Sequence, residues 1–293
     1  MKILNFGSIN IDYVYSVDHI VQPGETIKGL DRNVFCGGKG LNQSIALANA
    51  KADVTHAGLI GVEDGGMLLE ALNAAEVHTD LIKTVKGSSS HTVIQVDRSG
   101  QNSILFFAGD NLAIKEDYID EVIEKFEPGD YLLLQNEIGS IPLIMQKAAS
   151  KGMKIVFNPS PIHEAVKEYP LERIDIFVLN EIEGAMLTGH TSPDEILASM
   201  TDTFPDARTV LTLGKDGAMF GYRGEKIFRE AFQANAVDTT AAGDTFTGFF
   251  LAAFMKGRPV PDALRLAAKA AAISVSRYGA APSIPKLSEV DTI

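Results

Sequence analysis

Cysteine is almost absent from this chain, and tryptophan is missing altogether. Cys36 is the only cysteine among 293 residues, so no disulfide can form within the chain. A chain of this length can bury a large core without cross-links, as one α/β domain or as two. The six histidines show no metal-ligand spacing, so we expect no zinc site. The scarcity of cysteine fits a cytoplasmic location.

Basic residues are also scarce relative to acidic ones. The chain has 26 Lys and Arg against 38 Asp and Glu, a net charge of −12, so we expect no nucleic-acid partner. The longest apolar run, around Phe246 to Met255, is too short to cross a bilayer, and the first residues lack the layout of a signal peptide. We therefore expect no membrane partner. An acidic protein that handles phosphate must hold it with backbone amides, a metal or a few placed cations.

Short apolar runs alternate with patterns of helical spacing along most of the chain. Six runs suit buried parallel strands: Lys2–Ser8, Val54–Ile60, Tyr131–Gln135, Lys154–Asn158, Ile174–Leu179 and Thr209–Leu213. Helices are indicated at Gly40–Ala50, Met67–Ala75, Glu116–Phe126, Ile141–Ser150, Pro193–Met200, Gly243–Lys256 and Pro261–Tyr278. This alternation predicts a parallel sheet with helices on both faces.

Two segments interrupt this alternation, and no helix separates their strands. Asp12–Val17 and Thr26–Cys36 flank a Pro-Gly turn signal, and His91–Asp97 and Ser103–Phe107 read as a hairpin. We expect a small antiparallel sheet outside the main layer, from about 12–36 and 91–108. Such a sheet could cover a site as a lid, and its exposed edges could pair with a second copy to form a homodimer. The whole of 1–293 is predicted to be a single domain.

The segment Asp238–Asp244 packs small residues into a loop that runs directly into a helical pattern. The first N–H groups of a helix have no internal partner and carry the positive end of the helix dipole, so such a turn is an anion site. The small residues Ala241, Ala242 and Gly243 let a phosphate approach the backbone. Asp244 in the same turn sets a base beside a phosphoryl group, as required to deprotonate an attacking alcohol.

A second glycine-rich segment, Gly37–Gln43, also precedes a helix. It favours either a ligand contact at a helix N-terminus, with the Asn42 amide binding hydroxyls, or a tight strand-to-helix turn that Asn42 caps. It is neither a P-loop nor a dinucleotide-binding fingerprint, because the required spacings are absent.

Other polar side chains follow predicted strands. Asn10 and Asp12, two residues apart, face the same way and could hold neighbouring hydroxyls, or could be a solvated strand end. Glu137 lies just beyond the carboxyl end of a strand, where α/β sheets bind ligands.

Two further segments allow both structural and functional interpretations. Asn180 with Glu183 resembles a capping box, and the pair could also contact nucleotide phosphates or magnesium through water. The segment Thr212–Gly217 is a turn between strands that could also wall a nucleotide site.

Taken together, these motifs resemble the ribokinase-type (PfkB) family of sugar kinases almost from end to end. The matching segments are Gly7–Asp12, Pro23–Thr26, Gly37–Gln43, Asn158-Pro159, Asn180–Glu183, Thr212–Gly214, Ala236–Phe246 and Gly279–Ser283. The resemblance implies a three-layer αβα sandwich with a β-sheet lid, through which members often dimerise. It implies transfer of the ATP γ-phosphoryl group to a sugar hydroxyl, the 5-hydroxyl if the sugar is ribose.

The resemblance also implies roles for individual positions. Asp244 would be the base, and Ala241, Ala242 and Gly243 the anion hole. The sugar would be held by Asn10, Asp12, Gly37, Gly38, Asn42 and Glu137. ATP would contact Asn180, Thr212, Gly214, Gly217, Gly243 and Ala268. Glu183 would organise Mg²⁺ through water, and K⁺ would lie, largely on backbone carbonyls, at Asp238, Thr240, Ser274, Arg277, Gly279 and Ser283.

Two positions depart from the family pattern. Ala268 replaces a His or Asn against the adenine, which implies a loose nucleotide preference, and Phe249 replaces a small residue in the helix after Asp244. Two alternatives stay open. One is a related kinase acting on fructose, a keto-deoxy sugar acid or a nucleoside. The other is a non-catalytic sugar-binding regulator, against which the presence of Asp244 counts.

Overall fold

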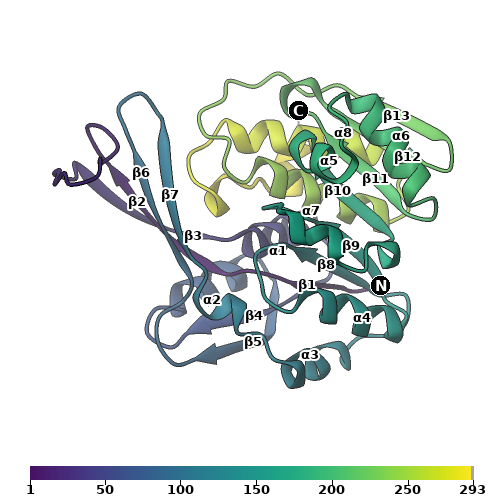
Figure 1. Ribbon diagram of the computed structural model, residues 1–293, viewed down its shortest axis with the longest axis horizontal. Coiled ribbons are helices and arrows are strands. Elements are labelled where there is room, and N and C mark those ends of the chain that lie inside the picture. Colours follow the sequence, from purple (N-terminus) through teal and green to yellow (C-terminus); the bar gives the residue numbers. More distant parts are fainter. Residues whose placement is uncertain (292–293) are drawn as a thin grey trace.

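The main sheet runs through the whole body of the protein (Figure 1). The computed structural model describes residues 1–291, so the last two residues of the predicted 1–293 domain lie outside the described residues. Across 1–291, nine strands form this sheet in the order β13-β12-β11-β10-β9-β8-β1-β4-β5. Their bounds are β1 Ile3–Phe6, β4 Val54–Gly61, β5 His78–Val85, β8 Tyr131–Gln135, β9 Lys154–Asn158, β10 Ile176–Asn180, β11 Arg208–Thr212, β12 Ala218–Tyr222 and β13 Glu225–Arg229. The strands pair in parallel except for the pairs β11–β12 and β12–β13, which are antiparallel.

Helices cover both faces of this sheet. One face carries α1 Lys39–Asn49, α2 Gly66–Ala74, α7 Ala242–Met255, α8 Val260–Val275 and α9 Leu287–Val290. The other carries α3 Glu116–Ile123, α4 Ile141–Lys151, α5 Glu181–Thr188 and α6 Pro193–Thr203. Each face has its own hydrophobic core, and neighbouring residues of a strand serve opposite cores: Leu133 faces α1 and α7, whereas Leu132 and Leu134 face α3 and α4. The αβα sandwich is therefore confirmed.

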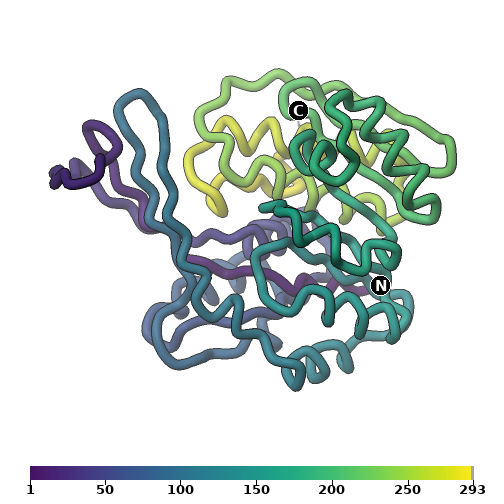
Figure 2. Tube along the Cα trace, viewed as in Figure 1, coloured from purple at the N-terminus to yellow at the C-terminus, as the bar shows by residue number. Residues whose placement is uncertain are grey.

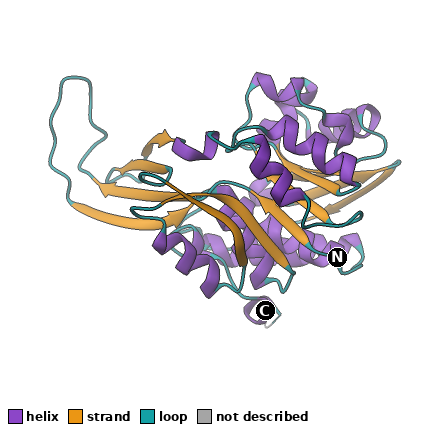
Figure 3. Ribbon diagram, turned by 90° about the horizontal axis from the view of Figure 1, so that it is seen from below, coloured by secondary structure: helices purple, strands orange, loops and turns teal. Residues whose placement is uncertain are grey.

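The second sheet projects away from the body (Figures 1 and 2). It contains β2 Asn10–Ser16, β3 Asp31–Gly37, β6 His91–Val96 and β7 Asn102–Phe107, in the order β3-β2-β6-β7. The prediction of a purely antiparallel sheet was wrong in one pairing, because β2 and β6 run parallel. They are not joined by a hairpin: both leave the main layer in the same direction and are linked through β3, α1, β4, α2 and β5, so the sheet is mixed. Figure 3 shows its strands continuing outward from the body.

Element boundaries follow the sequence patterns closely where both faces of a strand are buried. β8 and β9 begin and end at the predicted residues, since each has a continuous apolar centre, Leu132–Leu134 in β8 and Ile155–Phe157 in β9. α3 ends at Ile123 and α8 at Val275, each three residues before the predicted end. Strand β3 begins at Asp31 instead of Thr26. No helix among residues 1–291 is both long and apolar enough to cross a membrane.

Three strands were not predicted from the sequence. β5 is the last strand at one edge of the sheet, and Lys83, Thr84 and other polar residues interrupt its apolar pattern. β12 and β13 form the hairpin at the opposite edge, where β13 is mostly exposed. Edge strands bury less of each side chain, and the signal in their hydrophobic pattern is correspondingly weak.

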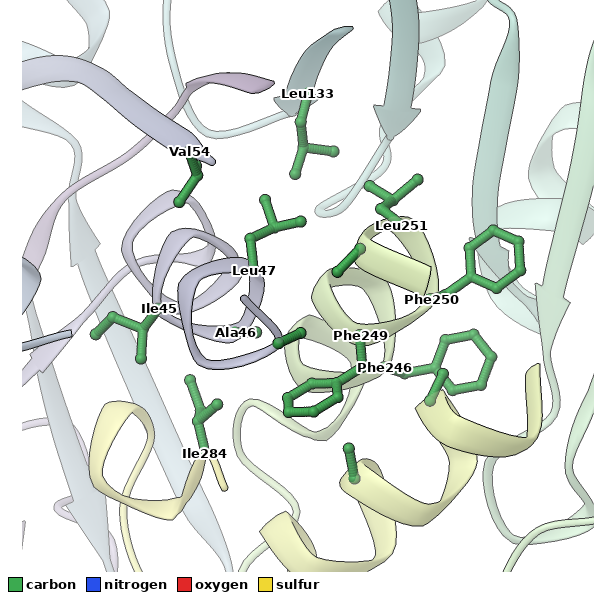
Figure 4. Close-up of a cluster of buried hydrophobic side chains, with 14 of the residues drawn as sticks. Ile45, Ala46, Leu47, Val54, Leu133, Phe246, Phe249, Phe250, Leu251 and Ile284 are labelled. Carbon is green, nitrogen blue, oxygen red and sulfur yellow. The ribbon is translucent and has the colours of Figure 1, made fainter. Parts of the chain in front are cut away.

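Close packing of α1 on α7 brings two distant parts of the chain together (Figure 4). A Cβ placed on Gly248 would lie 2.4 Å from Cβ of Ala46, so glycine allows the two helices to touch. Phe249, the predicted departure from the family pattern, is fully buried in the same core. One turn before Gly248 lies Asp244, and one turn before Ala46 lie Asn42 and Gln43.

Candidate active site

Asp244 is the third residue of α7, and its side chain is 7% exposed. Nδ2 of Asn42 donates to its Oδ2 at 3.0 Å, and Nε2 of Gln43 donates to its Oδ1 at 2.8 Å. Both donors come from α1, so the helix contact described above fixes the carboxylate from two sides. An amide N–H can only donate and a carboxylate oxygen can accept, so the two contacts hold both oxygens of Asp244 in place.

The turn that carries Asp244 leaves backbone donors at its surface. Ala241 is the N-cap of α7 with φ of 60°, a left-handed conformation that is uncommon for a residue other than glycine. Ala242 and Gly243 follow as the first helical residues. The N–H of Ala242 donates to the carbonyl of Thr239 at 3.3 Å, a long hydrogen bond, and the N–H of Gly243 lacks an acceptor within the helix. Apart from the chain neighbours and the backbone of the same helix, no atom of the described chain lies within 4 Å of a Cβ placed on Gly243. The space beside these amides is open to an anion.

A cavity of about 800 Å³ begins at this turn and extends to α8. Its lining includes five of the six predicted ATP residues: Thr212, Gly214, Gly217, Gly243 and Ala268. Lys215, which sequence reasoning did not single out, adds a cation to the wall. Ala268, Ala271 and Ala272 of α8 provide an apolar surface of methyl groups. The sixth predicted residue, Asn180, is not among the lining residues, although it pairs in register with Thr212 across β10 and β11.

Four of the predicted sugar residues meet where β2, β3 and α1 join. Asn10 and Asp12 lie two residues apart on β2 and so face the same side of its sheet. The Asp12 carboxylate lies against Gly37, where an added Cβ would come within 1.9 Å of Oδ2. Gly38 has φ of 91° as the N-cap of α1, and an added Cβ would approach the backbone N of Asn10 to 3.1 Å. Glycine is therefore needed at both positions for geometric reasons.

Glu137 closes this cluster from the end of β8. Its Oε2 accepts from the hydroxyl of Ser8 at 2.5 Å and from the backbone N–H of Lys39 at 3.0 Å. Ser8 follows β1 and Glu137 follows β8, and these two strands are neighbours in the sheet. The strand order reverses between them, because the chain runs from β1 outward to β4 and β5 and then returns to β8. Open α/β sheets bind ligands at such a switch point, beyond the carboxyl ends of the strands.

Lys39 is a site residue that the sequence-based assignment left out. Burial favours the neutral amine, but the carboxylates of Asp244, Glu137 and Glu183 outweigh it and raise the pKa of Lys39. Burial raises the pKa of Glu137, and the Lys39 charge partly opposes that change. The signal was visible as a lysine between glycines at a helix start, but its three acidic neighbours are distant in sequence.

Two contacts tie the projecting sheet to the sugar cluster. Asn111, just after β7, donates through Nδ2 to Oδ1 of Asn10 at 2.7 Å, and Thr92 of β6 donates to Oδ1 of Asp12 at 2.6 Å. Burial raises the pKa of Asp12, against the effect of the Thr92 hydrogen bond. Oδ1 of Asn111 and Oδ1 of Asn42 are buried without a hydrogen-bond partner among the described residues, so each can accept from a ligand hydroxyl.

Comparison with known proteins matches this arrangement. A family model described as pfkB family carbohydrate kinase matches residues 1–287. The chain belongs to the pfkB family of carbohydrate kinases. A Haemophilus influenzae ribokinase is 36% identical over 291 residues, 97% of this chain and 95% of that protein.

Two solved structures are similar to this pfkB kinase along almost its full length. Arabidopsis thaliana ribokinase complexed with ribose and ATP has a TM-score of 0.89 at 29% identity, covering 99% of this chain and 97% of that one. Cryptococcus neoformans ribokinase in complex with ADP has a TM-score of 0.86 at 32% identity, covering 99% of both chains. The ribokinase-like fold predicted from the sequence is therefore confirmed.

Glu183, the candidate magnesium residue of this kinase, takes part in the N-terminal cap of α5. Asn180 and Glu183 form a capping box: the backbone N–H and the side-chain amide of Asn180 donate to the two oxygens of Glu183. Burial raises the pKa of Glu183. Mg²⁺ often keeps several waters and takes few protein ligands besides substrate phosphates. A carboxylate held in this way fits a contact through water.

The candidate potassium residues form two linked groups. Asp238 accepts from the backbone N–H groups of Thr240 at 2.9 Å and Gly279 at 3.0 Å, which joins the loops on either side of α7 and α8. Burial opposes these hydrogen bonds, yet the net effect is a lowered pKa of Asp238. The hydroxyls of Ser274 and Ser283 lie 2.8 Å apart, and Arg277 pairs with Glu289. This set is rich in oxygen atoms, as a hard cation requires.

Proposed function

We propose that this kinase transfers the γ-phosphoryl group of ATP to the 5-hydroxyl of D-ribose. The observation that carries the proposal is the position of Asp244, between the nucleotide-sized cavity and the polar cluster of Asn10, Asp12 and Glu137. A polyol needs several fixed hydrogen-bond partners, and this cluster supplies carboxylates and amides together. Ribose is favoured because the relatives named above are ribokinases, one of them complexed with ribose and ATP.

The proposed reaction needs little covalent chemistry from the protein. Asp244 takes the proton of the 5-hydroxyl as the new O–P bond forms, when that hydroxyl becomes acidic. The amides of Ala242 and Gly243, with Lys39 nearby, meet the negative charge on the transferred phosphoryl oxygens. The remaining polar groups hold the sugar so that its hydroxyl faces the phosphorus.

We also propose Mg²⁺ and K⁺ as ions of this site. Mg²⁺, when bound, would neutralise the charge of the phosphates. K⁺ would neutralise the negative charge of the Asp238 group in the loops beside the anion hole. Glu183 would hold Mg²⁺ through water, and the Asp238 group would hold K⁺. The ATP requirement favours the cytoplasm as the location of the protein.

A homodimer through the projecting sheet completes the proposal. β7 is the edge strand of that sheet and is exposed along its whole length, including Ile104 at 57%, Leu105 at 70% and Phe107 at 55%. An exposed apolar edge strand favours pairing with another chain. We propose that the same sheet acts as a lid over the sugar.

Release of ADP in the presence of a sugar panel tests the reaction. The panel contains ribose, 2-deoxyribose, fructose, a keto-deoxy sugar acid and adenosine, each with and without K⁺. We expect ribose to give the highest kcat/KM and NMR of the product to show phosphate on the 5-oxygen. Faster turnover of fructose, the acid or adenosine would replace the substrate while keeping the family. No ADP above background with any compound would favour a non-catalytic binding protein.

A further inference from the structure

A chain of fully buried amides lies directly behind Asp244. Gln43, Gln135 and Asn5 have no exposed surface, nor do Ser44 and His56 beyond them. Nε2 of Gln135 donates to Oε1 of Gln43 at 2.7 Å and to Oδ1 of Asn5 at 3.0 Å. The side-chain amide of Asn5 donates to the carbonyl of Gly40 at 2.7 Å and to Oγ of Ser44 at 2.8 Å.

These contacts leave one orientation for the Gln43 amide. Its oxygen must face the donor Nε2 of Gln135. Its nitrogen must face two acceptors, Oδ1 of Asn158 at 3.1 Å and Oδ1 of Asp244 at 2.8 Å. Asn158 is oriented in turn, because its Nδ2 donates to the carbonyl of Val178 at 2.9 Å. A flipped Gln43 would set its oxygen against a carboxylate and its nitrogen against a donor.

The hydrogen bonds at the far end of this buried series, at Ser44 and His56, are fixed as well. Ser44 Oγ lies 2.8 Å from Nδ1 of His56, and Nε2 of His56 lies 3.3 Å from the carbonyl of Gly7. Ser44 accepts from Asn5, so its proton points to Nδ1, and His56 carries its own proton on Nε2. Every hydrogen-bond donor between His56 and Gln43 therefore has a fixed acceptor, and the last donor, Nε2 of Gln43, points at Asp244.

We infer that Gln43 is a positioning residue that sets the carboxylate of Asp244 for proton transfer. This inference rests on the proposed function. With Gln43 on Oδ1 and Asn42 on Oδ2, the plane of the carboxylate is held from both sides, and rotation about its bond to Cβ would break both hydrogen bonds. Asn42 lies at the proposed sugar site, whereas Gln43 faces the protein interior and acts through Asp244 alone.

The variant Gln43→Met tests this role, because methionine has a similar length and fills the space without donating. We expect kcat to fall about 10- to 100-fold, as for a misplaced catalytic group. The KM values for sugar and ATP should stay within about threefold, because Gln43 lies behind the site. Assays use the sugar that the wild-type enzyme phosphorylates fastest. If ribose is not the substrate, the wild-type assays will show it. If Gln43 has no positioning role, only the kcat of the variant will show it.

A double-variant cycle with Asp244→Asn separates positioning from general structural damage. If Gln43 acts through Asp244, adding Gln43→Met to Asp244→Asn should leave the residual rate unchanged within about twofold. The inference would be overturned if Gln43→Met lowered the rate of Asp244→Asn by the same factor as it lowers that of the wild type. It would also be overturned if folded Gln43→Met kept the wild-type kcat.

Tyr118→Phe is the control. It removes another buried polar group, a hydroxyl that bonds to Gly58 and Leu81, and this hydroxyl has no part in the hydrogen bonds that end at Asp244. Its melting temperature should fall while its kcat stays within about twofold of the wild type. If Gln43→Met does not fold, Gln135→Met removes the group that orients Gln43 and keeps the donor. A smaller loss of kcat is then expected, and an unchanged kcat would overturn the inference.

Discussion

At the scale of single residues, the site depends on which groups can donate and which can only accept. Asp244 accepts from two amides, Glu137 from a hydroxyl and a backbone N–H, and Lys39 is charged among their carboxylates. Two predictions separate the chemistry from the packing, because one change is nearly isosteric and the other adds a single methyl group.

Asp244→Asn should lower kcat by about a hundredfold or more, because an amide cannot take the proton from the attacking hydroxyl. Steady-state ADP release measures the loss, and circular dichroism checks the fold. Asp262→Asn is the control, since Asp262 is also in the first turn of a helix but is exposed and does not line the cavity. Activity of Asp244→Asn equal to that of the control would contradict the assignment of the base.

Gly243→Ala should lower activity by about tenfold or more while leaving stability unchanged or slightly higher. Apart from its chain neighbours and the backbone of its own helix, a methyl group here meets no atom of the described chain within 4 Å, so it would extend into the space proposed for phosphate. Alanine also favours a helix over glycine by up to about 1 kcal/mol. Initial rates and thermal melting report the two effects.

Gly66→Ala provides the comparison for that prediction. Gly66 begins α2, and a Cβ there is likewise free of contacts within 4 Å in the described structure. Its activity should match the wild type. A Gly243→Ala enzyme with full activity would exclude close approach of phosphate to this turn.

At the scale of elements, the contacts between helices and between sheets decide which residues meet. α1 and α7 touch at Gly248, and this packing brings Asn42 and Gln43 to Asp244 from about 200 positions away in the chain. The projecting sheet reaches the same site through Asn111 and Thr92.

Asn111→Ala should raise the KM for ribose about tenfold, the effect of losing one hydrogen bond of about 1 to 1.5 kcal/mol. Asn10 would lose its orienting donor, while the backbone carbonyl of residue 111 would still accept from Gly139. Asn102→Ala, at the exposed start of β7, is the control. Equal KM values for the two variants would show that Asn111 does not link the sheet to sugar binding.

At the scale of the whole molecule, assembly and acid stability are the properties to test. Leu105→Lys should convert the proposed dimer to a monomer, because it buries a charge at the centre of the paired edge. Light scattering after size-exclusion chromatography measures the mass. Val62→Lys changes an equally exposed apolar residue outside the projecting sheet and should leave the mass unaltered. A wild-type enzyme that is already monomeric at micromolar concentration would refute the dimer.

His56 predicts how stability changes in acid. Burial lowers its pKa from 6.5 to about 4, so the unfolded chain binds a proton in that interval and the folded chain does not. Stability therefore falls as the pH drops from about 6.5 to about 4, by about 3 kcal/mol in total from this group. Glu137 and Glu183, whose pKa values burial raises, have the opposite effect in acid.

A comparison with His56→Gln removes those opposing contributions. The free energy of unfolding of the variant, relative to the wild type, should rise by about 2 to 3 kcal/mol between pH 7 and pH 4.5. Urea unfolding at several pH values measures it, with His190→Gln, an exposed change, as the control. A difference that stays constant with pH would mean that His56 is not held neutral.

The amino-acid sequence determined the layers of this protein and the chemistry at its strand ends. A continuous apolar run such as Leu132–Leu134 is favourable only when both faces of its strand are buried, and the small residues before Asp244 can serve as an anion turn in any fold that forms the helix. Local physical chemistry therefore sufficed for the sandwich and for the motif.

Tertiary structure alone decided the pairing of β2 with β6, the three acidic neighbours of Lys39 and the amide chain that ends at Asp244. Gln43 ends the glycine-rich segment noted in the sequence, but glutamine carries no periodic or turn-forming signal, and the sequence assigned it no role. Its role follows from burial, since a buried amide must find partners, and those partners come from β8, β9 and α7.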